Sequence, residues 1–126
     1  TFAGNFRSDG MIVATPTGST GYSLASGGPI LDAEMRALII TPICPFTLSN
    51  RPLVTGEKEI VLEVLEHQRT NIVLTVDGQV LFELEEKDRI VVEMSSKRLR
   101  LIHSTKRNFT EVIREELHWA GDMRNA

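Results

Sequence analysis

The sequence predicts a mainly β domain of the α+β class. We expect an antiparallel β-sandwich with a short helix after a Gly/Thr loop and a second helix at the C-terminus. Short segments of alternating apolar and polar residues, separated by turn residues, fill the middle of the chain, and a helical period appears only near its end. Between Glu59 and Ile102 no segment reads as a helix long enough for a βαβ crossover, which favours antiparallel pairing.

The first half of the chain reads as strand, loop, helix and strand. Met11–Ala14 is a short apolar run that predicts a buried strand. Thr15–Ser19 is predicted as a loop, and Thr20–Ser26 as a short helix that Gly27-Gly28 ends. Ala37–Thr41 predicts another strand, which the prolines after it close.

The second half contains a run of short strands. Asp77-Gly78 lies between two of them and predicts a β-hairpin with a type I′ turn, because both central residues of that turn need positive φ. The predicted strands of this half are, in order, Glu59–Leu65, Asn71–Val76, Gln79–Leu84, Arg89–Met94 and Lys97–Ile102.

The last segment changes to a helical period. Asn108 and Glu111 have the spacing of a capping box, so we expect the helix to begin there, and Gly121 is the predicted end. Its apolar face is predicted to carry Phe109, Val112, Ile113 and Leu117.

Length and composition set the class of protein. The chain has 126 residues, which predicts one domain over 1–126, and its net charge of −3 argues against binding nucleic acid through bulk charge. Cys44 is the only cysteine, so no internal disulfide forms, which fits a reducing compartment. Apolar runs are too short to cross a bilayer, so no membrane partner is expected. Because the sequence starts at Thr1, we expect a fragment of a longer protein.

The Gly/Thr loop is the strongest candidate for chemistry. Its glycines and hydroxyls, entering a helix, suit phosphate or ribose groups, but the spacing is neither a Walker loop nor G-x-G-x-x-G. A ligand loop and a plain capped turn both stay open on these grounds. Ser23 lacks the second glycine of a nucleophile elbow, the three histidines lack metal-ligand spacing, and Gln79 points either to solvent or into a site.

The same loop carries a family resemblance. Residues 15–30 read T-P-T-G-S-T-G-Y-S-L-A-S-G-G-P-I, which is similar to the signature T-P-T-G-S-T-A-Y-S-L-S-A-G-G-P-I of the NAD kinases. Further matches follow the family's order, so the resemblance covers nearly the whole chain. These are Ser8-Asp9-Gly10, Thr41-Pro42-Ile43-Cys44-Pro45, Ser49-Asn50-Arg51-Pro52-Leu53-Val54, Val76-Asp77-Gly78-Gln79 and Leu101-Ile102-His103.

The resemblance implies a kinase that phosphorylates the 2′-hydroxyl of the adenosine ribose of NAD. The donor is ATP or, in some members, polyphosphate, with a divalent metal, usually magnesium. Members have two domains, and this chain resembles the C-terminal β-rich one. The Gly-Gly-Asp-Gly motif with the proposed base does not occur in the sequence. We therefore expect no catalytic residue and no metal ligand in this chain, and no activity from it alone.

The resemblance also implies the partners, location and oligomeric state of the protein, and two alternative functions stay open. We expect NAD and ATP as partners, a cytoplasmic location and a homodimer or homotetramer. The alternative function is a non-catalytic nucleotide-binding module; a related lipid-kinase type protein is a weaker one, because the adenine-side loop with Tyr22 is intact.

NAD-binding positions carry over residue by residue. Asp9 matches a position near the nicotinamide end, and Tyr22 matches the aromatic wall of the adenine side. Gly21 and Ala25 stand where the family commonly has alanine and serine, and Ala25 removes a hydroxyl. The predicted NAD-binding residues are Arg7, Asp9, Thr17, Thr20, Gly21, Tyr22, Ser23, Leu24, Ala25 and Gln79.

Overall fold

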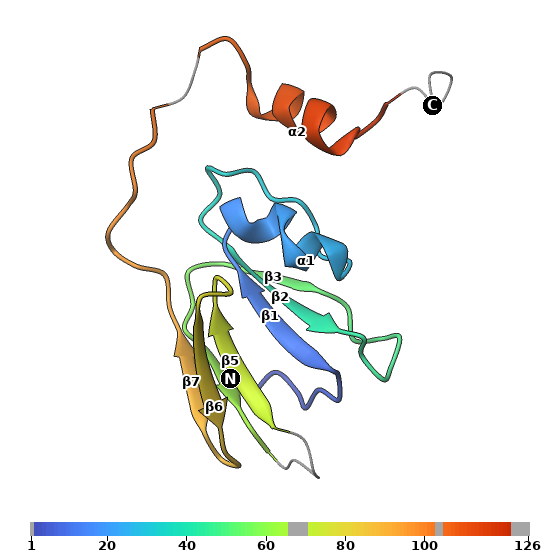
Figure 1. The fold of residues 1–126 in the computed structure, drawn as a ribbon, viewed down its shortest axis with the longest axis vertical. Coiled ribbons are helices and arrows are strands. Elements are labelled where there is room, and N and C mark those ends of the chain that lie inside the picture. Colours follow the sequence, from blue (N-terminus) through green and yellow to red (C-terminus); the bar gives the residue numbers. More distant parts are fainter. Residues whose placement is uncertain (1, 66–70, 103–104, 122–126) are drawn as a thin grey trace. The chain divides into compact units, whose positions relative to one another are not determined.

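The computed structural model describes residues 2–65, 71–102 and 105–121 (Figure 1). Two compact units divide the chain: the first comprises Thr1–Gly56 and Ser96–Ala126, and the second comprises Glu57–Ser95. Antiparallel strands dominate both, and a helix lies near the C-terminus. The predicted mainly β class with antiparallel sheets and a C-terminal helix is therefore confirmed.

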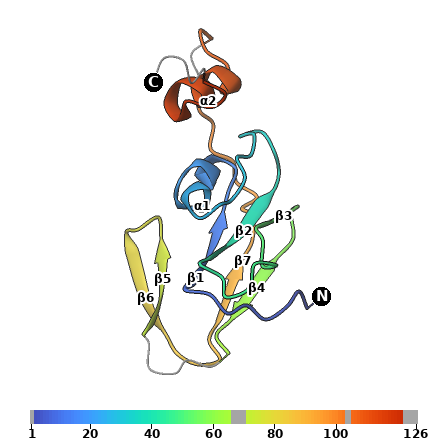
Figure 2. The ribbon, with the colours of Figure 1, turned by 90° about the vertical axis from the view of Figure 1, so that its right-hand side faces the viewer.

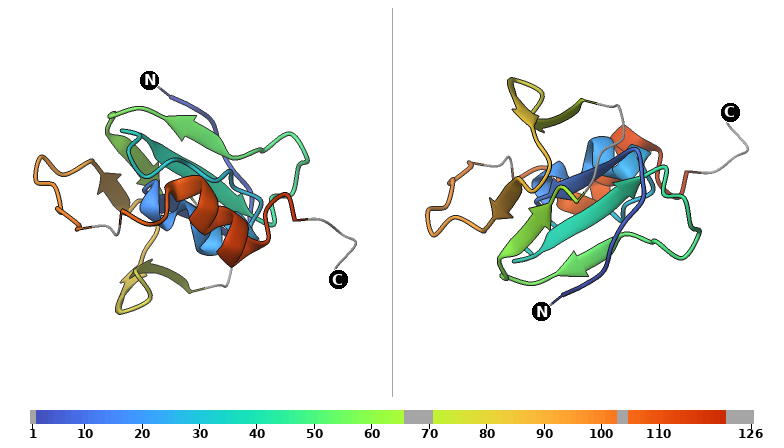
Figure 3. Two further views of the ribbon diagram at one scale, coloured as in Figure 1. Left: turned by 90° about the horizontal axis from the view of Figure 1, so that it is seen from above. Right: turned by 90° about the horizontal axis from the view of Figure 1, so that it is seen from below.

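The first unit is built on a three-stranded antiparallel sheet in the order β1-β2-β3. Strand β1 (Gly10–Ala14) pairs with β2 (Leu38–Ile43), and β2 pairs with β3 (Leu53–Thr55); β2 and β3 lie side by side in both views of Figure 3. β2 runs through Pro42 instead of stopping before it. β3 begins with Leu53 opposite Ile40, so no β3 residue lies opposite Pro42, and the N–H that proline lacks breaks no pairing on that side.

Two short helical turns follow β1. The 3₁₀ helix η1 spans Thr17–Thr20 and helix α1 spans Tyr22–Ala25. The prediction of one helix over Thr20–Ser26 is wrong at its start, because Gly21 has φ −91° and ψ −133°, outside the helical region. Both turns contact β1.

The apolar core of the first unit is small. Leu31, Ala37 and Ile39 form a buried cluster, and the neighbouring Ala14 and Leu38 are buried as well. Two of these residues lie at the start of β2, the middle strand of the sheet, so the segments before and after the helical turns meet over that strand.

The second unit consists of two antiparallel strand pairs. Strand β4 (Ile60–Glu63) pairs with β7 (Arg89–Val92), and β5 (Ile72–Val76) pairs with β6 (Val80–Leu84), the hairpin drawn in yellow in Figure 2. Asp77 has φ 51° and Gly78 has φ 68°, and the Gln79 N–H donates to the Val76 carbonyl at 3.0 Å. The predicted type I′ hairpin is confirmed.

One predicted strand is wrong. Lys97–Ile102 forms no strand, although its leucines alternate with basic residues. Leu99 is 85% exposed and Leu101 is 60% exposed, and neither residue has a paired neighbouring strand. Alternation predicts a strand only where a partner strand can satisfy the backbone, and this segment has none among the described residues.

The C-terminal helix α2 spans Phe109–Leu117 and begins as predicted. The Asn108 side chain accepts the Glu111 N–H at 2.9 Å, and the Glu111 carboxylate accepts the Asn108 N–H at 2.8 Å, which is a complete capping box. The helix ends before the predicted Gly121, because His118 already adopts a left-handed φ of 52°.

Candidate functional site

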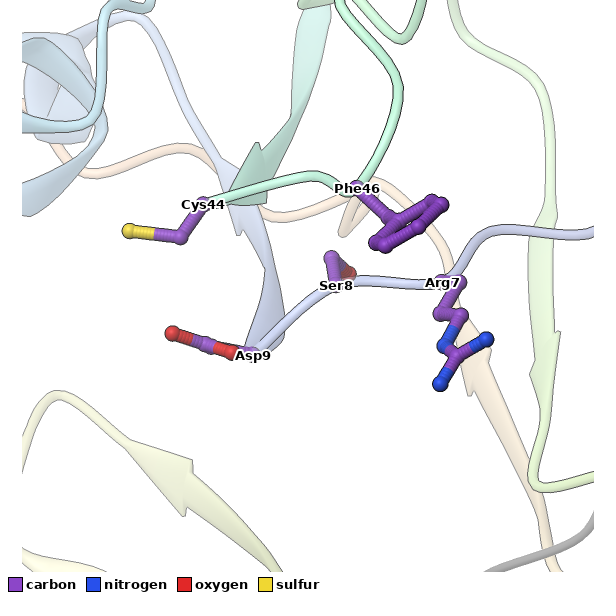
Figure 4. Close-up of a pocket in the computed structure, with 5 residues that line it drawn as sticks. All are labelled: Arg7, Ser8, Asp9, Cys44 and Phe46. Carbon is purple, nitrogen blue, oxygen red and sulfur yellow. The ribbon is translucent and has the colours of Figure 1, made fainter.

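A cavity of about 200 Å³ opens beside the N-terminal end of β1; we call it the Asp9 pocket. The side chains of Asp9 and Cys44 extend to the same side of it, whereas Arg7 and Phe46 lie at its other end (Figure 4). Its lining residues are Arg7, Ser8, Asp9, Cys44 and Phe46. Two of them, Arg7 and Asp9, are NAD-binding residues predicted from the resemblance, and both line this pocket.

Backbone hydrogen bonds hold the two segments of the Asp9 pocket together. The Asp9 N–H donates to the Ile43 carbonyl at 2.9 Å, and the Phe46 N–H donates to the Arg7 carbonyl at 2.9 Å. Between these bonds the chain turns at Cys44, whose φ of 44° is in the left-handed region. The pocket is therefore a continuation of the β1–β2 pairing beyond the strands.

Charge and aromatic groups in the Asp9 pocket suit a polar ligand. The Arg7 guanidinium carbon lies 5.0 Å from the centre of the Phe46 ring, which is cation–π distance. The Asp9 carboxylate is exposed and accepts no side-chain hydrogen bond from the described part of the chain. An exposed carboxylate of this kind is free to accept N–H groups of a bound molecule.

Residues 15–30, the signature loop, point two of their serine hydroxyls inward. Ser19 is 0% exposed, and its Oγ donates to the Pro16 carbonyl at 2.6 Å and accepts the Leu31 N–H at 3.1 Å. Ser23 is 1% exposed, and its Oγ lies 2.9 Å from Oγ1 of Thr41 on β2. Ser23 was predicted as a ligand contact, yet the structure directs its hydroxyl into the protein.

The other predicted loop residues face outward. Tyr22 is 63% exposed, and Leu24 is half-buried. Thr17 and Thr20 are exposed beside the break at Gly21, which carries no Cβ, and the Thr20 hydroxyl makes only a 3.5 Å contact to the Thr17 carbonyl. The exposed members of the predicted set in this loop are Thr17, Thr20, Gly21, Tyr22 and Ala25.

Gln79 belongs to the second unit, where it is exposed just after the hairpin turn. The remaining predicted residues all belong to the first unit. Residue-level reasoning missed Cys44 and Phe46 as pocket residues and Thr41 as the partner of Ser23. Cys44 and Thr41 both belong to the motif Thr41-Pro42-Ile43-Cys44-Pro45 of the resemblance, which is the signal that could have identified them.

A second cavity of about 210 Å³ lies in the same unit, next to the end of α1. Its walls come from the segment after α1, from Pro42 of β2 and from the loop between β2 and β3, and they include Ser26, Leu48 and Arg51. In residues 2–65, 71–102 and 105–121, no group of three His, Cys, Asp or Glu side chains lies close enough together to hold a metal ion. Within the same ranges no helix combines the length and apolar composition needed to cross a membrane.

Comparison with known proteins identifies the family of the chain. Residues 1–104 match the family model of the ATP-NAD kinase C-terminal domain. The NAD kinase of Magnetococcus marinus is 50% identical over 115 residues, covering 90% of this chain and 38% of that protein. The NAD kinase of Treponema denticola is 44% identical over 119 residues, covering 94% of this chain and 42% of that protein. This chain thus spans about two fifths of the length of these curated relatives.

A solved structure has the same fold. The crystal structure of yeast NADH kinase complexed with NADH matches with a TM-score of 0.83 and 29% identity, over 96% of this chain and 38% of that one. The range matched by the family model, residues 1–104, includes the Asp9 pocket and the signature loop. The chain therefore belongs to the NAD kinase family, as its C-terminal domain.

Proposed function

We propose that this chain is the NAD-binding C-terminal part of an NAD kinase. The complete enzyme transfers a phosphoryl group from ATP to the 2′-hydroxyl of the adenosine ribose of NAD and so produces NADP. The match of residues 1–104 to the ATP-NAD kinase C-terminal domain carries the proposal. Relatives named NAD kinase at 50% and 44% identity support it.

In this proposal the Asp9 pocket receives the nicotinamide end of NAD. The Asp9 carboxylate accepts the N–H groups of the carboxamide, since a carboxylate is an acceptor with several lone pairs. Arg7, held against Phe46, supplies a positive charge at the other end of the pocket. The accessible carboxylate and the fixed guanidinium are the features that support this placement.

The outward residues of the signature loop receive the adenosine. The exposed Tyr22 ring stacks on the adenine, and Thr17 and Thr20 offer hydroxyls to polar groups of the nucleoside. Gly21 and Ala25 leave room for the nucleotide, and Leu24 borders it. Ser23 acts through the position of its helix and makes no hydrogen bond to NAD. Gln79, which belongs to the second unit, stays an NAD-binding residue predicted from the resemblance alone.

The proposed reaction is an in-line phosphoryl transfer. The 2′-oxygen of the ribose forms a bond to the γ-phosphorus of ATP, and the bond from that phosphorus to the β,γ-bridging oxygen breaks. ADP leaves, and the hydroxyl proton passes to a base that lies outside this chain. Catalysis of such transfers depends mostly on positioning and charge stabilisation, and this domain contributes the positioning of the acceptor.

The remaining requirements belong to the complete protein. The described residues do not fit a metal site, so the divalent metal, expected to be magnesium, is not assigned to them. ATP or polyphosphate as donor, a cytoplasmic location and assembly into dimers or tetramers stay predictions.

The test is a coupled assay of NADP formation by the complete protein. We expect activity with NAD and ATP, and a large loss in Asp9→Ala with a smaller loss in Asp9→Asn, which keeps the shape of the side chain. Glu34→Ala, at an exposed carboxylate away from the pocket, is the matched control and keeps full activity. NADH is compared with NAD as the phosphoryl acceptor, and polyphosphate is compared with ATP as the donor, in parallel assays.

The alternative is a non-catalytic nucleotide-binding module. It makes a different prediction in the same experiment: NAD binds measurably, but no phosphate donor gives NADP. That outcome would reject the kinase and leave the binding site standing. Retained activity in Asp9→Ala would instead reject the placement of NAD in the Asp9 pocket.

A further inference from the structure

We propose that Thr41 is a positioning residue for NAD binding. Through its buried hydroxyl contact with Ser23, it holds α1 against β2 in the orientation that presents the outward loop residues to the nucleotide. The inference rests on the function proposed above and extends it to a residue that touches no ligand. Neither the family motif nor the exposure pattern alone would give Thr41 this role.

The contact joins two segments that are distant in the sequence. Ser23 Oγ and Thr41 Oγ1 are 2.9 Å apart, and 18 residues separate them along the chain. Both side chains are almost completely buried, and Thr41 lies opposite Ile12 in the sheet. A buried hydroxyl that loses its partner cannot turn to water, so each of the two groups favours the arrangement in which the other is present.

Gly28 packs against the contact between Ser23 and Thr41. Its N–H donates to the Ser23 carbonyl at 2.7 Å. A Cβ at this position would lie 2.9 Å from Thr41 Oγ1 and would also collide with Ser23 Oγ. Gly28, three residues after the end of α1, therefore packs directly on the hydroxyl pair and leaves no room there for a Cβ.

Helix α1 depends on this contact because it is short. Four residues form too few hydrogen bonds to be stable alone, so tertiary contacts set the orientation of α1. Tyr22 and Leu24 flank Ser23 directly, and a rotation of α1 moves both. When only a fraction of molecules holds the competent orientation, the apparent dissociation constant rises by the inverse of that fraction, whereas the chemistry after binding is unchanged.

The experiment uses the complete protein and measures NAD binding by calorimetry beside KM and kcat. Thr41→Val keeps the shape of the side chain and removes the hydroxyl. We expect it to raise the Kd and KM for NAD about tenfold with kcat within about twofold of the wild type. Thr41→Ser, which keeps the hydroxyl, restores the affinity. Ser23→Ala raises KM as well, and the double variant is no worse than Thr41→Val, because both changes break one contact.

The matched control is Ile39→Val, two residues earlier on the same strand and also fully buried. It lowers the melting temperature by removing one methylene but leaves the hydroxyl pair intact, so its KM stays at the wild-type value. An equal rise of KM in Ile39→Val, or an unchanged KM in Thr41→Val, overturns the inference. If Thr41→Val does not fold, Ser23→Ala alone decides between the same two results. A wild-type protein that binds no NAD overturns the proposed function instead, whatever the variants do.

Discussion

The hydroxyl of Ser19 accepts the backbone N–H of Leu31, twelve residues further along the chain, at 3.1 Å. The same oxygen donates its proton to the Pro16 carbonyl at 2.6 Å. One side chain thus satisfies two buried backbone groups and joins the beginning of the signature loop to the residue where the loop meets the core. The hydroxyl is structural, although it lies within the most ligand-like segment of the sequence.

The first prediction concerns this link. Ser19→Ala leaves the buried Leu31 N–H without its partner, so we expect the free energy of unfolding to fall by about 1–3 kcal/mol. Urea unfolding followed by circular dichroism measures the change. Thr20→Ala is the control, because its exposed hydroxyl makes only a 3.5 Å contact to the Thr17 carbonyl, and its stability stays close to the wild type. Equal losses in both variants would contradict the structural role of Ser19.

A second prediction separates two glycines. In Gly28→Ala the new Cβ lies 2.8 Å from the Ser23 carbonyl oxygen, a contact that forces the backbone to move, so we expect a loss of about 1–3 kcal/mol. Gly56→Ala meets nothing within 4 Å, and its expected effect is near zero or slightly stabilising. Thermal unfolding of both variants provides the comparison. A Gly28→Ala protein as stable as Gly56→Ala would show that the helical turn has more room than the structure gives it.

The third prediction tests the exposed aromatic ring of the loop. Because stacking on a base contributes about 1–3 kcal/mol, Tyr22→Ala should weaken NAD binding by about 5- to 150-fold. Tyr22→Phe keeps the ring and is expected to bind NAD like the wild type. Isothermal titration of the complete protein with NAD gives both constants. If Tyr22→Phe loses as much affinity as Tyr22→Ala, the hydroxyl and not the ring makes the contact.

The fourth prediction concerns the start of α2. Asn108→Ala removes the acceptor for the Glu111 N–H, and the loss of an N-cap costs about 1 kcal/mol. Amide hydrogen exchange should therefore speed up along α2 while the β1–β2 pairs keep their protection. Asn108→Ser retains an acceptor and should exchange at the wild-type rate. Unchanged exchange in Asn108→Ala would mean that contacts outside the capping box hold the helix.

Local chemistry explains which elements could be predicted from the sequence. The Asp77-Gly78 turn and the Asn108–Glu111 capping box depend on residues within a few positions of each other, and the structure confirms both. The strand predicted over Lys97–Ile102 depended on a partner strand, which alternation alone cannot supply. β3 was missed because three residues after a proline are too few to show a period.

The sequence predicted which segments form the site but not which of their side chains point inward. The signature identified the loop, but a run of small hydroxyl residues does not reveal which hydroxyls point inward. Ser23 faces Thr41 on β2, which lies 18 residues further along the chain, and no local pattern in the loop reveals such a distant partner. The Asp9 pocket could not be predicted without the pairing of β1 with β2. That pairing brings Cys44 and Phe46 beside residues 7–9, which precede β1.

The pattern of buried and exposed positions in the signature loop also tells a protein engineer which positions tolerate substitution. A randomised library at Thr17, Thr20 and Tyr22 samples new nucleotide preferences while the folded scaffold is kept, because these side chains face outward. The same library at Ser19 or Ser23 is expected to lower the stability of most clones, because both side chains are buried and hydrogen-bonded. The exposed hydroxyl residues of this motif can therefore evolve with the ligand, whereas the buried Ser19 and Ser23 evolve with the fold.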